Sequence, residues 1–100
     1  MTDFPTRRMR RTRATPALRR MVAETHLSAA QLVLPIFVKE GVTSSQPIAS
    51  MPGVEQHPLD RVAELTVAAA DAGLGGVMLF AIPEVRDATG SAAVDPEGIL

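Results

Sequence analysis

Residues 32–38 read LVLPIFV, a continuous apolar run with polar residues on either side. A second run of the same kind, GVMLFAI, covers residues 76–82 and is stopped by Pro83. Short apolar runs without polar alternation are typical of strands that are buried on both faces in a parallel sheet. Pro35 counts against the first strand, because proline cannot donate a hydrogen bond to a central ladder. We nevertheless expect two buried parallel strands.

The segment between these strands predicts a helix that crosses from one strand to the next. Pro58 suits the first helical position, Asp60 falls in the first turn, and Gly73 suits the residue just past the end. One face of this helix is apolar; its members are Leu59, Val62, Ala63, Val67 and Ala70. Residues 39–57 are expected to form a long connection with a type II turn at Ser50-Met51-Pro52-Gly53. Strand, helix and strand together make one βαβ unit.

The two ends of the chain predict one short helix each. Residues 1–14 lack apolar periodicity, and Thr15 followed by Pro16 suits a helix start, so we expect an extended arm and a helix over 16–25. Asp95-Pro96 carries the same start signal, and the chain stops four residues after Pro96. We therefore expect a piece of a larger α/β protein. Residues 1–30 would be a basic arm, and residues 31–100 the first part of a TIM (β/α)8 barrel, truncated at the start of its second helix.

Charge is divided unevenly along the chain. Residues 1–20 hold seven arginines and one aspartate, a net of +6, whereas residues 21–100 hold three basic groups and ten acids, a net of −7. An arginine-rich arm suits nucleic-acid phosphates, a transit peptide, a solvated tail, or an acidic surface on a neighbouring subunit. The acidic body favours the last use, because a second copy supplies the complementary charge.

Several functional classes are excluded by composition. The chain has no cysteine, which excludes disulfides and thiolate ligands, and its two histidines, His26 and His57, are isolated. Three aromatic residues are too few for a stacking platform on single-stranded nucleic acid. No stretch approaches the roughly 20 apolar residues of a membrane span. We expect a cytoplasmic protein with neither nucleic acid nor a membrane as a partner.

Several motifs, in unbroken order from about residue 7 to residue 100, resemble the porphobilinogen synthase (δ-aminolevulinic acid dehydratase) family. The strand segment Leu32-Val33-Leu34-Pro35-Ile36-Phe37-Val38-Lys39-Glu40-Gly41, the connection Pro47-Ile48-Ala49-Ser50-Met51-Pro52-Gly53-Val54, and the second-strand motif Leu79-Phe80-Ala81-Ile82-Pro83-Glu84 carry it. Arg10-Arg11-Thr12 and Pro16-Ala17-Leu18-Arg19-Arg20 precede them, and Gly90-Ser91-Ala92-Ala93 and Asp95-Pro96-Glu97-Gly98 follow. Ala81 stands where the family has glycine, and the 85–90 loop is shorter than expected.

The resemblance implies a lyase that condenses two 5-aminolevulinate molecules to porphobilinogen, with loss of two waters, in tetrapyrrole (heme) biosynthesis. It implies Schiff bases on active-site lysines, a zinc or magnesium requirement, and a homo-octamer in which the arm embraces a neighbouring subunit. The family's catalytic lysines and cysteine zinc ligands match nothing in this chain. Its one lysine, Lys39, follows the first strand and is expected to be a solvated loop residue.

We expect no catalytic residue and no metal ligand within these 100 residues, and no activity of the chain alone. Phe80, at the end of the second strand, is either a core aromatic or a wall of the substrate pocket, and it is the pocket candidate. The charged residues of the 83–94 loop would lie on the active-site face, where loop charges are usually only solvated. His57 is expected in a turn and His26 at a helix end. The candidates for a subunit interface are Arg7, Arg8, Arg10, Arg11 and Arg13.

Two other functions fit parts of the sequence. A truncated interaction module could bind full-length subunits through the arm. A nucleic-acid binder would use the same arginines, but the acidic body and the scarce aromatics argue against it.

Overall fold

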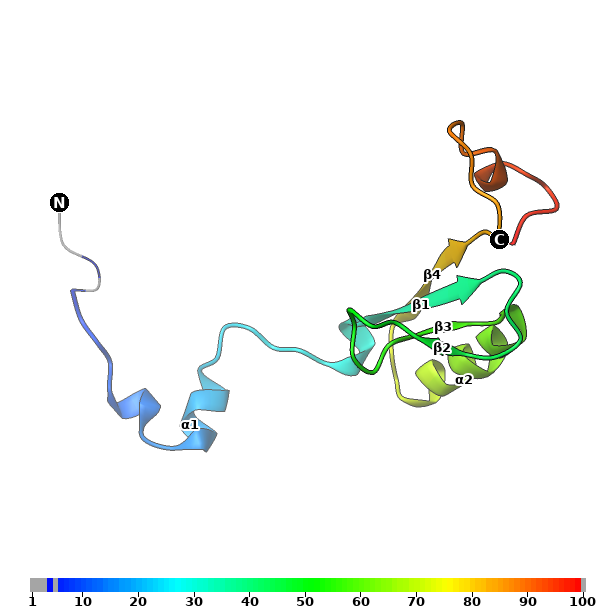
Figure 1. The fold of residues 1–100 in the computed structure, drawn as a ribbon. Helices are drawn as coiled ribbons and strands as arrows, with labels where there is room; N and C mark the ends of the chain where they lie inside the picture. The colour runs from blue at the N-terminus through cyan, green and yellow to red at the C-terminus, as the bar shows by residue number, and fades with distance from the viewer. Residues whose placement is uncertain (1–3, 5, 100) are drawn as a thin grey trace.

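The computed structural model describes residue 4 and residues 6–99. It contains a four-stranded sheet with the strand order β2-β3-β1-β4, and α2 (Val62–Asp71) lies against one face of that sheet (Figure 1). β1 (Val33–Lys39) and β4 (Gly76–Ile82) are parallel and paired along their whole length, from Val33 opposite Gly76 to Lys39 opposite Ile82. The predicted α/β architecture, with two parallel strands joined by a crossover helix, is confirmed.

The predicted crossover helix has a tighter first turn than expected. Pro58 precedes a 3-10 turn at Leu59–Arg61, and the α-helix itself starts only at Val62. Gly73 follows the helix with a φ of 81°, and its N–H donates to the Ala70 carbonyl at 2.9 Å. This left-handed conformation is strained for residues with a Cβ, so the predicted glycine stop is confirmed.

The predicted long connection contains two strands that the sequence analysis missed. β2 (Gln46–Pro47) is antiparallel to β3 (Glu55–His57), and β3 is parallel to β1. The predicted turn between them is confirmed, because the Val54 N–H donates to the Met51 carbonyl at 3.0 Å and Gly53 has a φ of 83°. Strands of two and three mostly polar residues carry no apolar alternation, so their pairing depends on the turn and on β1.

Pro35 fits in β1 because one side of the strand is open at that point. It is paired with Met78 of β4, whereas β3 pairs with β1 only at Phe37 and Val38. A missing N–H on the side away from β4 therefore breaks no strand pairing there. Burial in β1 also differs from the expected two-sided pattern. Ile36 and Val38 are buried, whereas residues 33–35 are exposed.

Both predicted terminal helices need correction. α1 runs over Pro16–Met21 and not over 16–25, although Thr15 caps it as predicted by accepting the Leu18 N–H at 3.1 Å. None of its residues is buried, and short helices without packing are marginal in water. At Asp95-Pro96 the described residues form a turn in place of a helix. The Asp95 carboxylate accepts the Glu97 N–H at 2.9 Å and its carbonyl accepts the Gly98 N–H at 3.0 Å.

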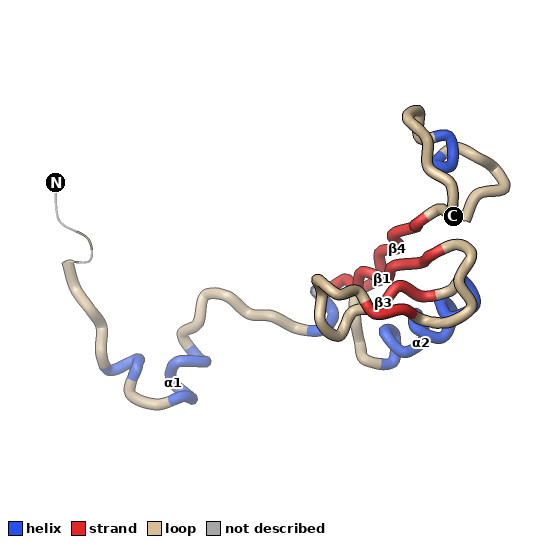
Figure 2. The backbone as a smooth tube through the Cα atoms, in the orientation of Figure 1, coloured by secondary structure: helices blue, strands red, loops and turns tan. Residues whose placement is uncertain are grey.

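The N-terminal segment extends away from the sheet (Figure 1), and the chain measures 60 × 38 × 26 Å along its principal axes. Apart from α1 and a 3-10 turn at Arg11–Arg13, the first part of this segment is loop (Figure 2). Residues 1–3 and 5 of the predicted arm, and residue 100 of the predicted last helix, lie outside the described residues. The division into an arm over 1–30 and a barrel segment over 31–100 stays a prediction.

Candidate functional site

The carboxyl ends of β1 and β4 lie side by side, and the loop of residues 83–94 follows β4 at this edge. Lys39 and Ile82 are opposite each other in the last pair of the ladder. Ligand and catalytic sites of parallel α/β folds form at this edge, because the connecting loops converge there. Functional side chains are therefore expected among the residues that follow the two strands.

Glu40, the residue after β1, forms hydrogen bonds with the end of β4 and with the chain beyond it. Its N–H donates to the Ile82 carbonyl at 3.0 Å, which extends the ladder by one bond. Its carboxylate Oε2 accepts the Glu84 N–H at 2.9 Å, a contact between residues 44 positions apart. Gly41 follows with a φ of 77°, and a Cβ at that position would lie 3.2 Å from the Glu84 Oε1. The Glu84 carboxylate therefore packs over the glycine.

Lys39 is the last residue of β1 and is half-buried, so the prediction of a solvated loop lysine is wrong in its placement. Its Nζ lies 3.5 Å from the Gln46 Oε1. The paired ladder with β4 extends through Lys39, which is why the strand includes it.

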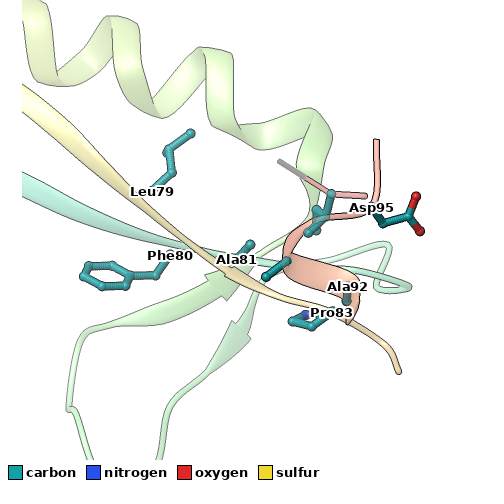
Figure 3. A pocket seen from close by; sticks show the side chains of 8 residues that line it. Leu79, Phe80, Ala81, Pro83, Ala92 and Asp95 are labelled. Carbon is teal, nitrogen blue, oxygen red and sulfur yellow. The ribbon is translucent and has the colours of Figure 1, made fainter. Parts of the chain in front are cut away.

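Phe80 lies on the face of the sheet opposite α2. It is paired with Phe37, and the two rings are stacked with centroids 5.5 Å apart and an interplanar angle of 24°. Leu79 and Phe80 point to opposite sides of β4 (Figure 3). Phe80 is 44% exposed and lines a hollow of about 270 Å³ along the outer edge of β4, together with Leu79 and Ala81 of the same strand and with Ala92 and Asp95 beyond it. The structure thus places the predicted pocket candidate beside open space.

The loop after β4 is held in shape by Asp87. Its carboxylate accepts the Ser91 N–H at 2.9 Å, the Ser91 hydroxyl, and the Thr89 hydroxyl at 3.2 Å. The hydrogen bond from the Ser91 side chain is the main reason that the pKa of Asp87 is lowered from 3.8 to about 2. The sequence analysis treated these loop residues as solvated. Asp, Gly and Ser are residue types that favour turns, and their presence in this loop could have indicated this role.

The two histidines do not lie where the sequence analysis expected them. His57 is the last residue of β3 and not a turn residue, and its Nδ1 lies 2.8 Å from the Ser45 Oγ. His26 is exposed and lies beyond α1, which ends at Met21, so it is not at a helix end. The first difference follows from the missed strand, and the second from the shorter helix.

Comparison with known proteins identifies the family. The family model described as delta-aminolevulinic acid dehydratase matches residues 6–100. The chain belongs to this family. A delta-aminolevulinic acid dehydratase of Mycobacterium leprae is 54% identical over all of this chain and 31% of the relative, and one of Streptomyces coelicolor is 52% identical over 98% of this chain and 30% of the relative. The chain therefore spans about 30% of the length of these relatives.

A solved structure of the same family has the same fold over the matched region. It is the delta-aminolevulinic acid dehydratase (porphobilinogen synthase) of Toxoplasma gondii ME49, in complex with the reaction product porphobilinogen. The match has a TM-score of 0.80 and 29% sequence identity, and it covers 92% of this chain and 26% of that chain. This family fold is a TIM barrel, and the βαβ unit with its extra hairpin corresponds to part of it.

The resemblance to this family implies a zinc or magnesium ion. Within residue 4 and residues 6–99, no three histidine, cysteine or acidic side chains lie close enough together to hold one. The donor set of this part of the chain does not fit a metal centre.

The arginines proposed for a subunit interface are all exposed in this family member. Arg11 and Arg13 lie in the 3-10 turn before α1, and the Arg13 carbonyl accepts a hydrogen bond from the Arg19 Nη1 at 2.8 Å. The single ion pair among the described residues joins Arg61 and Glu64. An interface role for the arm arginines stays a prediction. In the described part of the chain, no helix has the length and apolar character that a membrane crossing needs.

Proposed function

We propose that the chain supplies the first strands and the arm of a porphobilinogen synthase. The whole enzyme would condense two 5-aminolevulinate molecules to one porphobilinogen and two waters, a lyase reaction. The observation that carries the proposal is the match, at a TM-score of 0.80, to a solved enzyme that holds porphobilinogen. Identity of 54% to a Mycobacterium leprae member supports the same reaction.

The chain's own contribution would be binding and not covalent chemistry. Schiff-base formation needs a lysine with a lowered pKa, and Lys39 is the chain's only lysine. Its side-chain nitrogen lies 3.5 Å from the amide oxygen of Gln46, and no other side chain in the described residues is seen to hydrogen-bond it. The lysines that form Schiff bases would therefore come from the rest of the enzyme. Phe80 would supply an apolar wall beside the substrate.

A chimera tests this proposal. Residues 1–100 replace the matching segment of the Mycobacterium leprae relative, and porphobilinogen formation from 5-aminolevulinate is measured against the unaltered relative. We expect kcat/KM within about tenfold of the relative, because half of the exchanged residues are identical. The 100-residue chain alone is expected to form no porphobilinogen. A chimera that folds and assembles but forms no product would refute the proposed function.

The arm supports a second candidate function, an interaction module that binds full-length subunits. Its arginines are exposed, and the arm extends away from an acidic body (Figure 1). Individual surface ion pairs contribute only about 0–1 kcal/mol, so such an arm would orient a partner more than hold it. This second candidate function requires the 100-residue chain to co-elute with the full-length relative. No co-elution at any mixing ratio would exclude this function.

The remaining properties that we propose come from the family resemblance. They are a role in heme biosynthesis, a zinc or magnesium ion bound outside this segment, a homo-octamer, and a cytoplasmic location. Chelation followed by readdition of each metal, and light scattering of the chimera, would test the metal and the assembly state. Cell fractionation would test the location.

A further inference from the structure

The loop of residues 83–94 is attached to the rest of the molecule by a bond that the proposed reaction does not require. Inside the loop, Asp87 closes a turn through Ser91 and Thr89. Such a turn fixes the shape of the loop but not its position over the sheet. Position must come from a contact between the loop and another element.

That contact is made by Glu40. Its Oε2 accepts the N–H of Glu84, the second residue of the loop, at 2.9 Å. Its own N–H is held by the Ile82 carbonyl at 3.0 Å, so the backbone that carries this carboxylate is itself fixed to the end of β4. A hydrogen bond to a carboxylate is stronger than one between neutral groups. This bond can therefore hold the start of the loop in place.

Gly41 reinforces the arrangement. Its φ of 77° turns the chain away immediately after Glu40, and the Glu84 carboxylate lies over it, where a Cβ would be 3.2 Å from two of that group's atoms. Beyond this hydrogen bond, Ala92 of the loop and Asp95 just after the loop line the hollow along the edge of β4, together with Leu79 and Phe80 of the strand. A shift at Glu84 would therefore change the loop side of this hollow.

We infer that Glu40 is a positioning residue, which holds the start of the 83–94 loop at the carboxyl end of β4 and so sets the loop side of the hollow along that strand. The inference rests on the proposed function for what occupies that hollow. It does not make Glu40 a catalytic residue, because its carboxylate is engaged by a backbone amide and not by a reacting group.

The test uses the chimera and three variants. Glu40→Ala removes the acceptor, Glu40→Gln keeps an amide oxygen that can accept the same N–H, and Glu55→Ala is a matched control at an exposed glutamate of β3. We expect KM of Glu40→Ala to rise about tenfold with kcat nearly unchanged, because a displaced loop weakens substrate binding. Glu40→Gln should restore KM to within about threefold of the chimera, and Glu55→Ala should leave it unchanged.

Amide hydrogen exchange supplies a readout that does not depend on activity. Exchange at Glu84 should become about tenfold faster in Glu40→Ala and stay slow in Glu40→Gln. Unchanged protection in Glu40→Ala, or equal losses in the Ala and Gln variants, would overturn the inference. An inactive parent chimera would instead refute the proposed function, and the exchange result would still decide whether Glu40 holds the loop.

Discussion

Gly75 offers a sharp test of how β4 is joined to the chain before β1. A Cβ at Gly75 would overlap the Ala30 carbonyl oxygen and lie 3.3 Å from the Leu32 carbonyl oxygen. Both neighbours are backbone atoms, which cannot rotate away as a flexible side chain can. The Gly75 N–H also donates to the Leu32 carbonyl at 2.9 Å, so any shift that relieves the overlap weakens this bond. Gly75→Ala should therefore separate the start of β4 from residues 30–32.

The expected loss follows from these two terms. Overpacking costs about 1–3 kcal/mol, and a weakened backbone hydrogen bond adds about 1 kcal/mol. We expect Gly75→Ala to lower the stability of the chimera by about 3 kcal/mol, which is a fall in Tm of about 4 °C for a protein of roughly 330 residues. Gly76→Ala is the control, because a Cβ there meets nothing within 4 Å. Thermal unfolding of both variants is the assay, and equal shifts in Tm would refute the argument from Gly75.

Three further predictions concern the loop, the aromatic pair and the chain alone. The lowered pKa of Asp87 means that its hydrogen bonds stabilise the loop above about pH 4 and are lost as pH falls toward 2. In the selectively labelled chimera, an NMR titration of the Asp87 carboxyl should have its midpoint at about pH 2, and Ser91→Ala should move that midpoint back toward 3.8. An unchanged midpoint in Ser91→Ala would show that Ser91 is not the cause of the shift. Phe80→Ala should raise KM of the chimera about tenfold. Phe37→Ala removes the same aromatic stack without opening the hollow, so it should raise KM less. Equal rises in KM would mean that the stacking of the two rings matters and that Phe80 is not a wall of the substrate pocket. The 100-residue chain alone should unfold without a sharp transition, because its sheet carries exposed apolar side chains, and a cooperative two-state melt in calorimetry would contradict this.

The main elements of the fold could be predicted because their signals are local. The strands β1 and β4 are apolar runs with polar or proline boundaries, and Gly73 ends α2 in a left-handed conformation that its residue type favours. The turn before β3 carries proline and glycine at the positions that a type II turn requires. Each of these signals depends on a few adjacent residues, so no knowledge of the rest of the chain was needed.

The missed elements depend on contacts between distant residues. β3 is a strand because Gln56 and His57 pair with β1, which no pattern within three residues can show. The role of Glu40 depends on an amide 44 positions away. At Asp95 a local signal was present, but the predicted element did not form. The Asp95 carboxylate accepts the Glu97 N–H as a helix cap would, but a cap alone does not supply the further turns that a helix needs.

The uneven burial of β1 connects the fold to the proposed function. Ile36 and Val38 are 3% and 0% exposed on the α2 side, whereas Phe37 and its partner Phe80 stack on the other face, where Phe80 is 44% exposed. The sequence predicts burial on both faces, and the described residues cover only one. In the TIM barrel of this family, the uncovered face would be the barrel interior, which the other strands close. Phe80 would then help to exclude water beside the substrate, which is why we expect Phe80→Ala to raise KM.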